Sequence, residues 1–353
     1  MNPSRKDTNN RQPQFELLRV LCMFGIVVTH FFTYGLDIYG LRGEVFTLSV
    51  DSISDAVLWA VLEGMKLISL ACVNCFVLIS GYFMVNEQGF RLNGIKKVWS
   101  QTWFYSVTIF LVLCILGIES FFTGKMLQLC FPVFTNQYWF ITSYVALMLL
   151  APFLSRMVSF LDKSGYVKLL VIGFFLCFQY AFGQIFMDSN KLLLFVYLFI
   201  VGGYIRRFGV FQDIRKRYCG LLAVAVYLLM FAVAVIKNMR SASDAYLIYA
   251  MEDYSLVLPL SVLLFVAFTE VRCSSFVSRV IPLFSESVLA VYLIHSHPVM
   301  QEWMWKEVGD YVLSYPPVLL PLFCLFFSLV IFVLCVAVDG VRRGVGIFLP
   351  RKK

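Results

Sequence analysis

An arginine and a histidine stand inside the first apolar stretch of the chain, FELLRVLCMFGIVVTHFF, residues 15 to 32. Arg19 and His30 are eleven positions apart. Eleven helical steps of about 100° bring both side chains to one face of a helix, about 16 Å apart along its axis. A guanidinium binds phosphate groups, and an imidazole transfers protons near neutral pH. The pair therefore predicts a path along one helix, with an anion site at one end and an acid/base group, His30, at the other.

Each of the two residues also has a purely structural explanation when it is taken alone. An arginine one turn inside a membrane span can extend its side chain to the lipid headgroups. A buried histidine can bridge helices through hydrogen bonds. Ionisable groups within a span are nevertheless candidates for function, because their burial in lipid is unfavourable. Their common face favours the functional interpretation.

The other two histidines lie in SESVLAVYLIHSHPVM, residues 285 to 300. His295 and His297 are two positions apart, about 200° on a helix, so they cannot face one cavity if the helix continues through both. Pro298 predicts that the helix bends or ends there. We expect His295 at a depth similar to that of His30, as a supporting or substrate-contacting residue, and His297 at the outer interface.

The stretch NCFVLISGYFMV, residues 74 to 85, supplies three more candidates: Asn74, Ser80 and Gly81. Gly81 is expected at the level of Arg19, where the missing side chain lets a ligand or another helix approach closely. Small residues that serve only helix packing are the alternative.

A second polar and aromatic stretch, NQYWFITSYVALMLLAPFL, covers residues 136 to 154 and is expected to start at the outer face. Tyr138 and Trp139 at its start are typical of the aromatic belt at a membrane interface. A platform for a sugar substrate is the alternative for this pair.

The elements that position these residues follow from composition. Of the 353 residues, 60% are hydrophobic and only 14% are charged, which predicts an all-α polytopic membrane protein rather than a soluble one. A span needs about 20 predominantly apolar residues. Ten such segments are expected, leaving no soluble domain, and the second is either one long span or a surface helix followed by a span. They are centred near residues 25, 75, 108, 148, 175, 199, 228, 262, 291 and 329.

The positions of lysine and arginine predict the orientation, because basic residues concentrate in cytoplasmic connections. With the N-terminus inside, every inner connection but one carries at least three basic residues, and no outer connection carries more than two. Both termini are therefore expected in the cytoplasm. We expect residues 1–14 as a disordered cytoplasmic tail, 15–340 as the transmembrane domain and 341–353 as a basic cytoplasmic tail. The net charge of +8 follows from this distribution and does not indicate nucleic-acid binding.

The motifs together resemble membrane-bound acyltransferase family 3, whose bacterial members O-acylate surface polysaccharides. The resemblance rests on an arginine followed by ten residues and a histidine, then FVLISGYF, YWFITSYVALMLLAPFL and VYLIH in the same order. It extends from about Phe15 to Pro298, and the first motif is the specific one. The chain is similar to the membrane-only form of the family.

The resemblance implies an integral membrane O-acyltransferase of the bacterial plasma membrane, with acyl-CoA, expected to be acetyl-CoA, as donor. Arg19 would bind the CoA phosphates, and the pantetheine arm would pass Ser80 and Gly81 to reach His30. His30 would act as general base on a hydroxyl of a cell-surface or lipid-linked saccharide, with a transient acyl-histidine as the alternative. His295, Asn74 and the Tyr138–Trp139 pair would support or bind the substrate.

The main alternative to an enzyme is a transporter, flippase or polymerase of polysaccharide precursors. Such proteins show spans broken by proline or glycine, and intramembrane charges on several helices. Apart from Glu63 and Lys66 in the second apolar segment, where an ion pair at the interface is expected, the buried charge of this sequence concentrates in the first span. Neither a Ser-His-Asp arrangement nor a metal-binding cluster can be assembled from the motifs, and no metal cofactor is expected.

Overall fold

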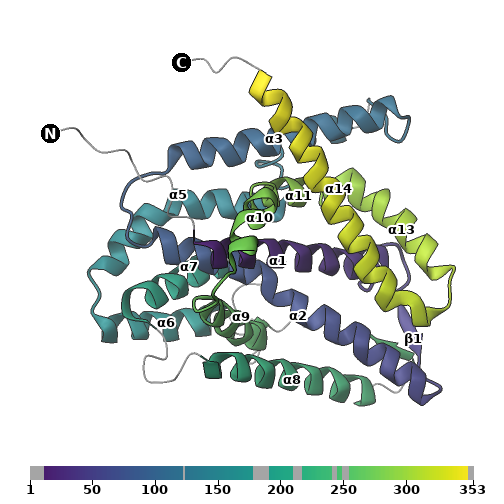
Figure 1. Ribbon diagram of the computed structural model, residues 1–353, viewed down its shortest axis with the longest axis horizontal. Helices are drawn as coiled ribbons and strands as arrows, with labels where there is room; N and C mark the ends of the chain where they lie inside the picture. Colours follow the sequence, from purple (N-terminus) through teal and green to yellow (C-terminus); the bar gives the residue numbers. More distant parts are fainter. Residues whose placement is uncertain are drawn as a thin grey trace.

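The computed structural model describes residues 12–121, 124–177, 191–209, 217–240, 245–248 and 254–348. These residues form mostly α-helices, which confirms the all-α polytopic class (Figure 1). The helices and helical turns are α1 (Pro13–His30), the π-helical turn η1 (Phe31–Gly35), α2 (Ile53–Met84), α3 (Leu92–Ile115), α4 (Lys125–Cys130), α5 (Trp139–Ser159), α6 (Lys163–Cys177), α7 (Lys191–Phe208), α8 (Arg217–Arg240), α9 (Tyr254–Phe268), α10 (Ser275–Ser285), α11 (Val288–His295), α12 (Pro298–Glu302), α13 (Met304–Leu313), the 3₁₀ turn η3 (Pro317–Leu319) and α14 (Leu320–Phe348).

Six helices in the described part of the chain are long and apolar enough to cross a membrane: α1, α2, α3, α5, α8 and α14. α10 and α11, which are bent by 42° relative to each other, form a seventh if they are one broken span. Helices also occupy the other three expected positions. α6 and α9 have only 15 residues each, and α7 carries three basic residues among its 18. Ten crossings and cytoplasmic termini therefore stay predictions.

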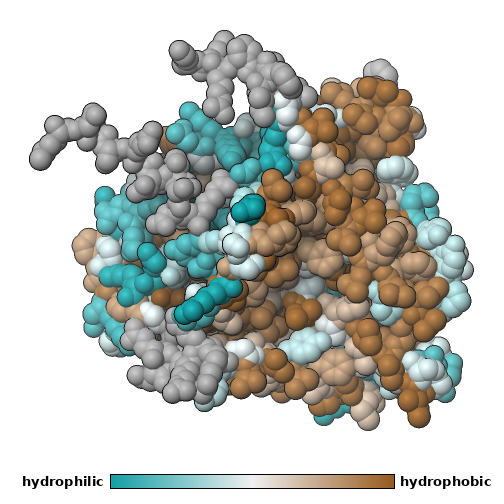
Figure 2. Space-filling view, viewed as in Figure 1, coloured by the Kyte–Doolittle hydropathy of each residue, from teal (hydrophilic) through white to brown (hydrophobic). Residues whose placement is uncertain are grey.

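Apolar side chains cover the face of the molecule over α14 (Figure 2). Hydrophilic residues gather at the left of the same view, beside the ends of α5, α6 and α7. The large exposed apolar side chains of α14 are Leu322, Leu325, Phe326, Leu329, Val333, Leu334, Val338 and Val341. A surface of this kind fits contact with lipid, since soluble proteins rarely expose large contiguous apolar patches.

Several helix boundaries follow from local sequence. α1 begins with Pro13 in its first turn, where a missing N–H costs no hydrogen bond. Ser52 caps α2, its Oγ accepting from the backbone N–H of Asp55 at 3.3 Å. α2 then runs without interruption over 32 residues, so the second expected span is one long helix. α11 ends at His295 and a new helix begins at Pro298, which confirms the expected break.

The ends of the helical domain differ by a few residues from the expected bounds. The helix α1 includes residues 13 and 14, and α14 continues eight positions past residue 340 to Phe348. The rest of the two expected tails, residues 1–11 and 349–353, lies outside the described residues.

α1 and α2 lie at the centre of the helix packing. α2 packs against both α1 and α7, and α1 also contacts α10, α11 and α14. In Figure 1, α1 runs from left to right through the middle of the bundle, whereas α14 runs from the lower right to the upper left. Residues of α1, α2, α5 and α11 thereby surround a common space.

A two-stranded antiparallel sheet joins the connection after α1 to the connection after α8. Its strands are β1 (Thr47–Ser49) and β2 (Ala245–Leu247), with Thr47 opposite Leu247. The indole Nε1 of Trp59 donates to the Leu247 carbonyl at 3.0 Å and fixes the sheet to α2. Each strand has three residues, too few for the sequence to indicate a sheet.

Candidate active site

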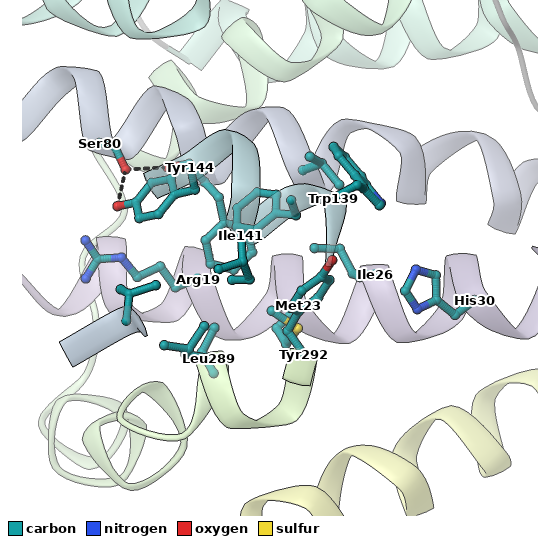
Figure 3. Close-up of a pocket in the computed structure, with 15 residues that line it drawn as sticks. Arg19, Met23, Ile26, His30, Ser80, Trp139, Ile141, Tyr144, Leu289 and Tyr292 are labelled. Carbon is teal, nitrogen blue, oxygen red and sulfur yellow. Dashed lines mark hydrogen bonds between the residues drawn. The ribbon is translucent and has the colours of Figure 1, made fainter. Parts of the chain in front are cut away.

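A cavity of about 240 Å³ runs along one face of α1 between α2, α3, α5 and α11. α1 contributes four residues spaced by four, three and four positions, which is the spacing of one helical face. Figure 3 shows Arg19 and His30 toward opposite ends of this row, with Met23 and Ile26 between them. The lining residues are Arg19, Met23, Ile26, His30, Val73, Phe76, Ser80, Val98, Trp139, Phe140, Ile141, Tyr144, Val288, Leu289 and Tyr292.

The Arg19 end of the cavity is open and charged. The Arg19 side chain is 35% exposed, and its Nη1 lies 2.6 Å from Oε1 of Glu16, one turn earlier on α1. Glu16 therefore neutralises part of the guanidinium charge, and within the described residues the other guanidinium nitrogens have no hydrogen-bond partner and can meet an incoming anion. The remaining lining of the cavity is mostly apolar.

The His30 end of the cavity meets the C-terminal end of α11. The Nδ1 of His30 lies 3.3 Å from the Ser296 hydroxyl, which lies 3.3 Å from Nε2 of His295. The rings of His30 and His295 have centroids 4.9 Å apart, and Tyr34 packs edge-on against His30 at 5.1 Å. The structure therefore brings His30 and His295 together, although they are 265 positions apart in the sequence.

The two histidines of the α11–α12 segment use both ring nitrogens within the protein. Nδ1 of His295 lies 2.5 Å from the Val291 carbonyl, and Nε2 faces Ser296. His297 caps α12 with Nδ1, which accepts from the Val299 N–H at 3.2 Å, and its Nε2 lies 3.1 Å from the Ser106 carbonyl.

His297 is fully buried inside the protein, and its expected depth at the outer interface stays a prediction. A cap for a new helix after Pro298 explains this burial. Among the three histidines, His30 alone has a ring nitrogen with no hydrogen-bond partner in the described part of the chain.

The turn after α11 is fixed by further hydrogen bonds. The Trp305 indole donates to the His295 carbonyl at 3.0 Å, and the Gln301 amide donates to the Ser296 carbonyl at 3.2 Å. The ammonium of Lys125 binds Glu302 at 2.7 Å and Glu119 at 3.0 Å, which ties α12 to the connection before α4. These two carboxylates raise the pKa of Lys125. The backbone around His295 and Ser296 is thus held from several directions.

Two of the other candidates line the cavity. The Ser80 hydroxyl donates to the Phe76 carbonyl at 3.1 Å, and it lies 3.1 Å from the Tyr144 hydroxyl across the cavity (Figure 3). Trp139 is 37% exposed. The Lys191 ammonium lies over its ring, with Nζ 5.8 Å from the ring centroid. Trp139 lies toward the His30 end of the cavity, away from Arg19 (Figure 3).

Gly81 lies outside the cavity, although it follows Ser80. A Cβ atom on Gly81 would lie 2.2 Å from the Phe199 carbonyl oxygen, so the missing side chain lets α2 approach α7. Gly202 of α7 approaches α2 in the same way, next to the Leu78 carbonyl. Of the two roles predicted for Gly81, the structure therefore supports close packing of helices and not contact with a ligand.

Asn74 and Tyr138 also point away from the cavity. The Asn74 amide donates to the Ser261 hydroxyl on α9 at 3.1 Å. The Tyr138 hydroxyl donates to the Leu293 carbonyl on α11 at 3.2 Å, and its side chain is buried. Both residues join helices that enclose the site rather than lining it.

Tyr144, Tyr292 and Ser296 are site residues that were not predicted from sequence. Tyr144 and Trp139 both belong to α5 and line the cavity, although five helical steps set them about 140° apart around the helix axis. Ser296 stands between His295 and His297, where a serine shortly before a proline is typical of a turn. Its place beside His30 depends on how α11 packs against α1, which one sequence does not reveal.

The described residues contain no group of three or more His, Cys, Asp or Glu side chains placed to hold a metal ion. A protein-family model described as an acyltransferase domain matches residues 12–339. The chain therefore belongs to the membrane-bound acyltransferase family 3, as its motifs suggested, and it is a multi-pass membrane acyltransferase. No curated protein and no solved structure matches the chain.

Proposed function

We propose that this protein transfers an acyl group, in the first instance acetyl, from acyl-CoA to a hydroxyl group of a cell-surface or lipid-linked saccharide. The observation that carries the proposal is the cavity along α1, which joins the partly exposed Arg19 at one end to His30 at the other. Nε2 of His30 has no hydrogen-bond partner among the described residues. The family supplies the reaction type, acyl transfer. The plasma membrane of a bacterium is the proposed location.

The Arg19 end of the cavity suits the nucleotide part of acyl-CoA. A guanidinium presents several N–H donors to phosphate oxygens, and Arg19 is exposed enough to meet them. Arg91 stands just before α3 and forms an ion pair with Glu87, which raises the pKa of Arg91. The predicted cytoplasmic orientation of these groups fits a donor made in the cytoplasm.

The middle of the cavity suits the pantetheine arm and the thioester. Met23, Ile26, Phe76 and Leu289 give it an apolar lining. The hydroxyls of Ser80 and Tyr144 give it a few polar groups. This combination is typical of small-molecule sites, in which few polar groups fix the orientation of the ligand.

His30 is the proposed general base. Its free nitrogen accepts the proton of the saccharide hydroxyl while the hydroxyl oxygen bonds to the acyl carbon. The carbon–sulfur bond then breaks, and the CoA thiolate leaves and takes the proton from the imidazolium as free thiol. Trp139 at this end of the cavity offers an aromatic face for the sugar ring.

The test is acyl transfer from radiolabelled acetyl-CoA to extracted surface glycan, in membranes that contain the wild-type protein or the variants His30→Ala and His30→Gln. Removal of a general base lowers the rate by about 10² to 10⁴. Ser155→Ala is the matched control, since Ser155 is a buried serine of α5 that binds the Met84 carbonyl away from the cavity. Expression and membrane insertion are compared for all variants.

Label in the glycan that disappears with both His30 variants, and persists with Ser155→Ala, is the expected result. Equal labelling by wild type and His30 variants removes His30 from the chemistry. No labelling with any tested donor or acceptor overturns the proposed function and favours the transport or polymerisation of saccharide precursors.

A further inference from the structure

The hydroxyl of Ser296 lies between two imidazole rings, at 3.3 Å from Nδ1 of His30 and 3.3 Å from Nε2 of His295. A hydroxyl has one proton, so it can donate to only one of these two nitrogens. The direction of both hydrogen bonds therefore depends on which nitrogens of the rings carry protons. The contacts of His295 decide this.

Nδ1 of His295 must carry a proton, because the Val291 carbonyl at 2.5 Å can only accept. His295 is fully buried between the rings of Tyr292 and Trp305, and its hydrogen bonds in the described structure go to neutral groups. A buried ring without a carboxylate partner is favoured in its neutral form. Nε2 of His295 is then unprotonated and accepts the proton of the Ser296 hydroxyl.

The direction of the remaining bond follows. With its own proton donated to His295, the Ser296 oxygen can only accept from His30. Nδ1 of His30 must then carry the proton, which leaves Nε2 of His30 unprotonated. Nε2 is the ring nitrogen of His30 without a hydrogen-bond partner in the described part of the chain.

We propose that Ser296 and His295 are positioning residues that hold His30 in the Nδ1–H tautomer, so that its Nε2 is the atom that accepts the substrate proton. This inference rests on the proposed function for the identity of the reaction, but the tautomer is a property of the protein alone. We call these three residues the His30–Ser296–His295 chain. A histidine whose other nitrogen is fixed by a hydrogen bond keeps its orientation and its tautomer during catalysis.

Further hydrogen bonds hold the His30–Ser296–His295 chain in position. Trp305 and Gln301 bind the carbonyls of His295 and Ser296, which fixes the backbone from which both side chains extend. The helix α11 ends at His295, so Ser296 can turn toward α1. A continuous helix would rotate Ser296 by about 100° from His295 and separate the two side chains.

The test is nitrogen NMR of the full-length protein in lipid bilayers, with ¹⁵N-labelled histidine. Protonated and bare ring nitrogens have well-separated shifts, and the His30 signals are assigned by their absence from His30→Gln. The expected result for wild type is a protonated Nδ1 and a bare Nε2 on His30. A protonated Nε2 with a bare Nδ1 overturns the proposal. This result comes from the wild-type spectrum, and His30→Gln serves only to assign the signals.

Three variants sharpen the test. In His295→Phe the Ser296 hydroxyl has lost its acceptor and can donate its hydrogen bond to Nδ1 of His30. The His30 tautomer is therefore expected to change to Nε2–H. Ser296→Ala is expected to give mixed tautomers and to lower kcat by about 10-fold to 100-fold, as losses of such supporting hydrogen bonds do, with KM for acetyl-CoA unchanged. Ser296→Thr keeps the hydroxyl, so its His30 tautomer and its kcat are both expected to match those of the wild type.

Ser155→Ala is again the control and is expected to leave the histidine spectrum unchanged. An unchanged His30 tautomer in both His295→Phe and Ser296→Ala contradicts the proposal. The NMR spectrum can show the expected His30 tautomer while the protein transfers no acyl group to any tested acceptor. That combination supports the His30–Ser296–His295 chain and overturns the proposed function.

Discussion

Arg19 and Glu16 form an ion pair on one turn of α1, with 2.6 Å between Nη1 and Oε1, at the end of the cavity opposite His30. The guanidinium is about one-third exposed, so water and a ligand phosphate can compete with the carboxylate for it. An exposed ion pair of this kind contributes only about 0.2 to 1 kcal/mol. The pair can therefore hold the arginine in place without preventing it from binding an anion.

Substitution of Arg19 is expected to weaken the binding of acyl-CoA more than it slows the chemical step. Hydrogen bonds to charged groups contribute about 1.5 to 3 kcal/mol, so Arg19→Ala should raise KM for acetyl-CoA by about 10-fold to 100-fold. Steady-state kinetics in membranes measures this change, with kcat expected within a few-fold of wild type.

Two variants control for this effect. Arg156→Ala removes a basic residue in the last turn of α5, outside the lining of the cavity, and should leave KM unchanged. Glu16→Gln removes the competitor for the guanidinium and should lower KM by about twofold to fivefold, in line with the energy of an exposed pair. A tenfold loss of kcat in Arg19→Ala, with KM unchanged, would contradict a role in donor binding.

Gly81 is expected to matter for helix packing. An added Cβ would meet the Phe199 backbone at 2.2 Å, and backbone cannot move aside as a side chain can. Overpacking of this kind costs about 1 to 3 kcal/mol, so Gly81→Ala should lower the unfolding temperature of the purified protein. Gly220→Ala is the matched control, because a Cβ there meets no atom within 4 Å. Normal stability of Gly81→Ala, with a raised KM for acetyl-CoA, would instead place the ligand against this glycine.

The class of fold and both ends of the cavity could be predicted from sequence, because they depend on local rules. Hydrophobic segments predict membrane helices, and an eleven-residue spacing places Arg19 and His30 on one face. The partners of His30 could not be predicted, since Ser296 reaches it through packing between α1 and α11. Gly81 is the opposite case: the sequence allows either a ligand or a helix beside it, and the packing of α7 against α2 selects the helix.

Ser80 is expected to control the width of the cavity beside Tyr144. Its hydroxyl lies 3.1 Å from the Tyr144 hydroxyl, so a larger side chain at this position enters the space that the pantetheine arm would use. Ser80→Leu should lower kcat/KM for acetyl-CoA at least tenfold, or about 1.4 kcal/mol. Tyr144→Phe removes the same hydrogen bond without narrowing the cavity and should cost only a few-fold. Equal losses in the two variants would show that the hydrogen bond matters and the width does not.

His297 is expected to support the structure and not the chemistry, in contrast to His30. Its Nδ1 caps α12, and its Nε2 binds the Ser106 carbonyl on α3, so neither nitrogen is available to a substrate. Loss of a cap costs about 0.5 to 2 kcal/mol, so His297→Ala should lower the unfolding temperature. Asparagine is a good capping residue, and His297→Asn should recover part of this stability. Activity per folded molecule should stay close to wild type in His297→Asn. A loss of kcat by about 10² or more in that variant, at unchanged unfolding temperature, would assign His297 a part in proton transfer instead.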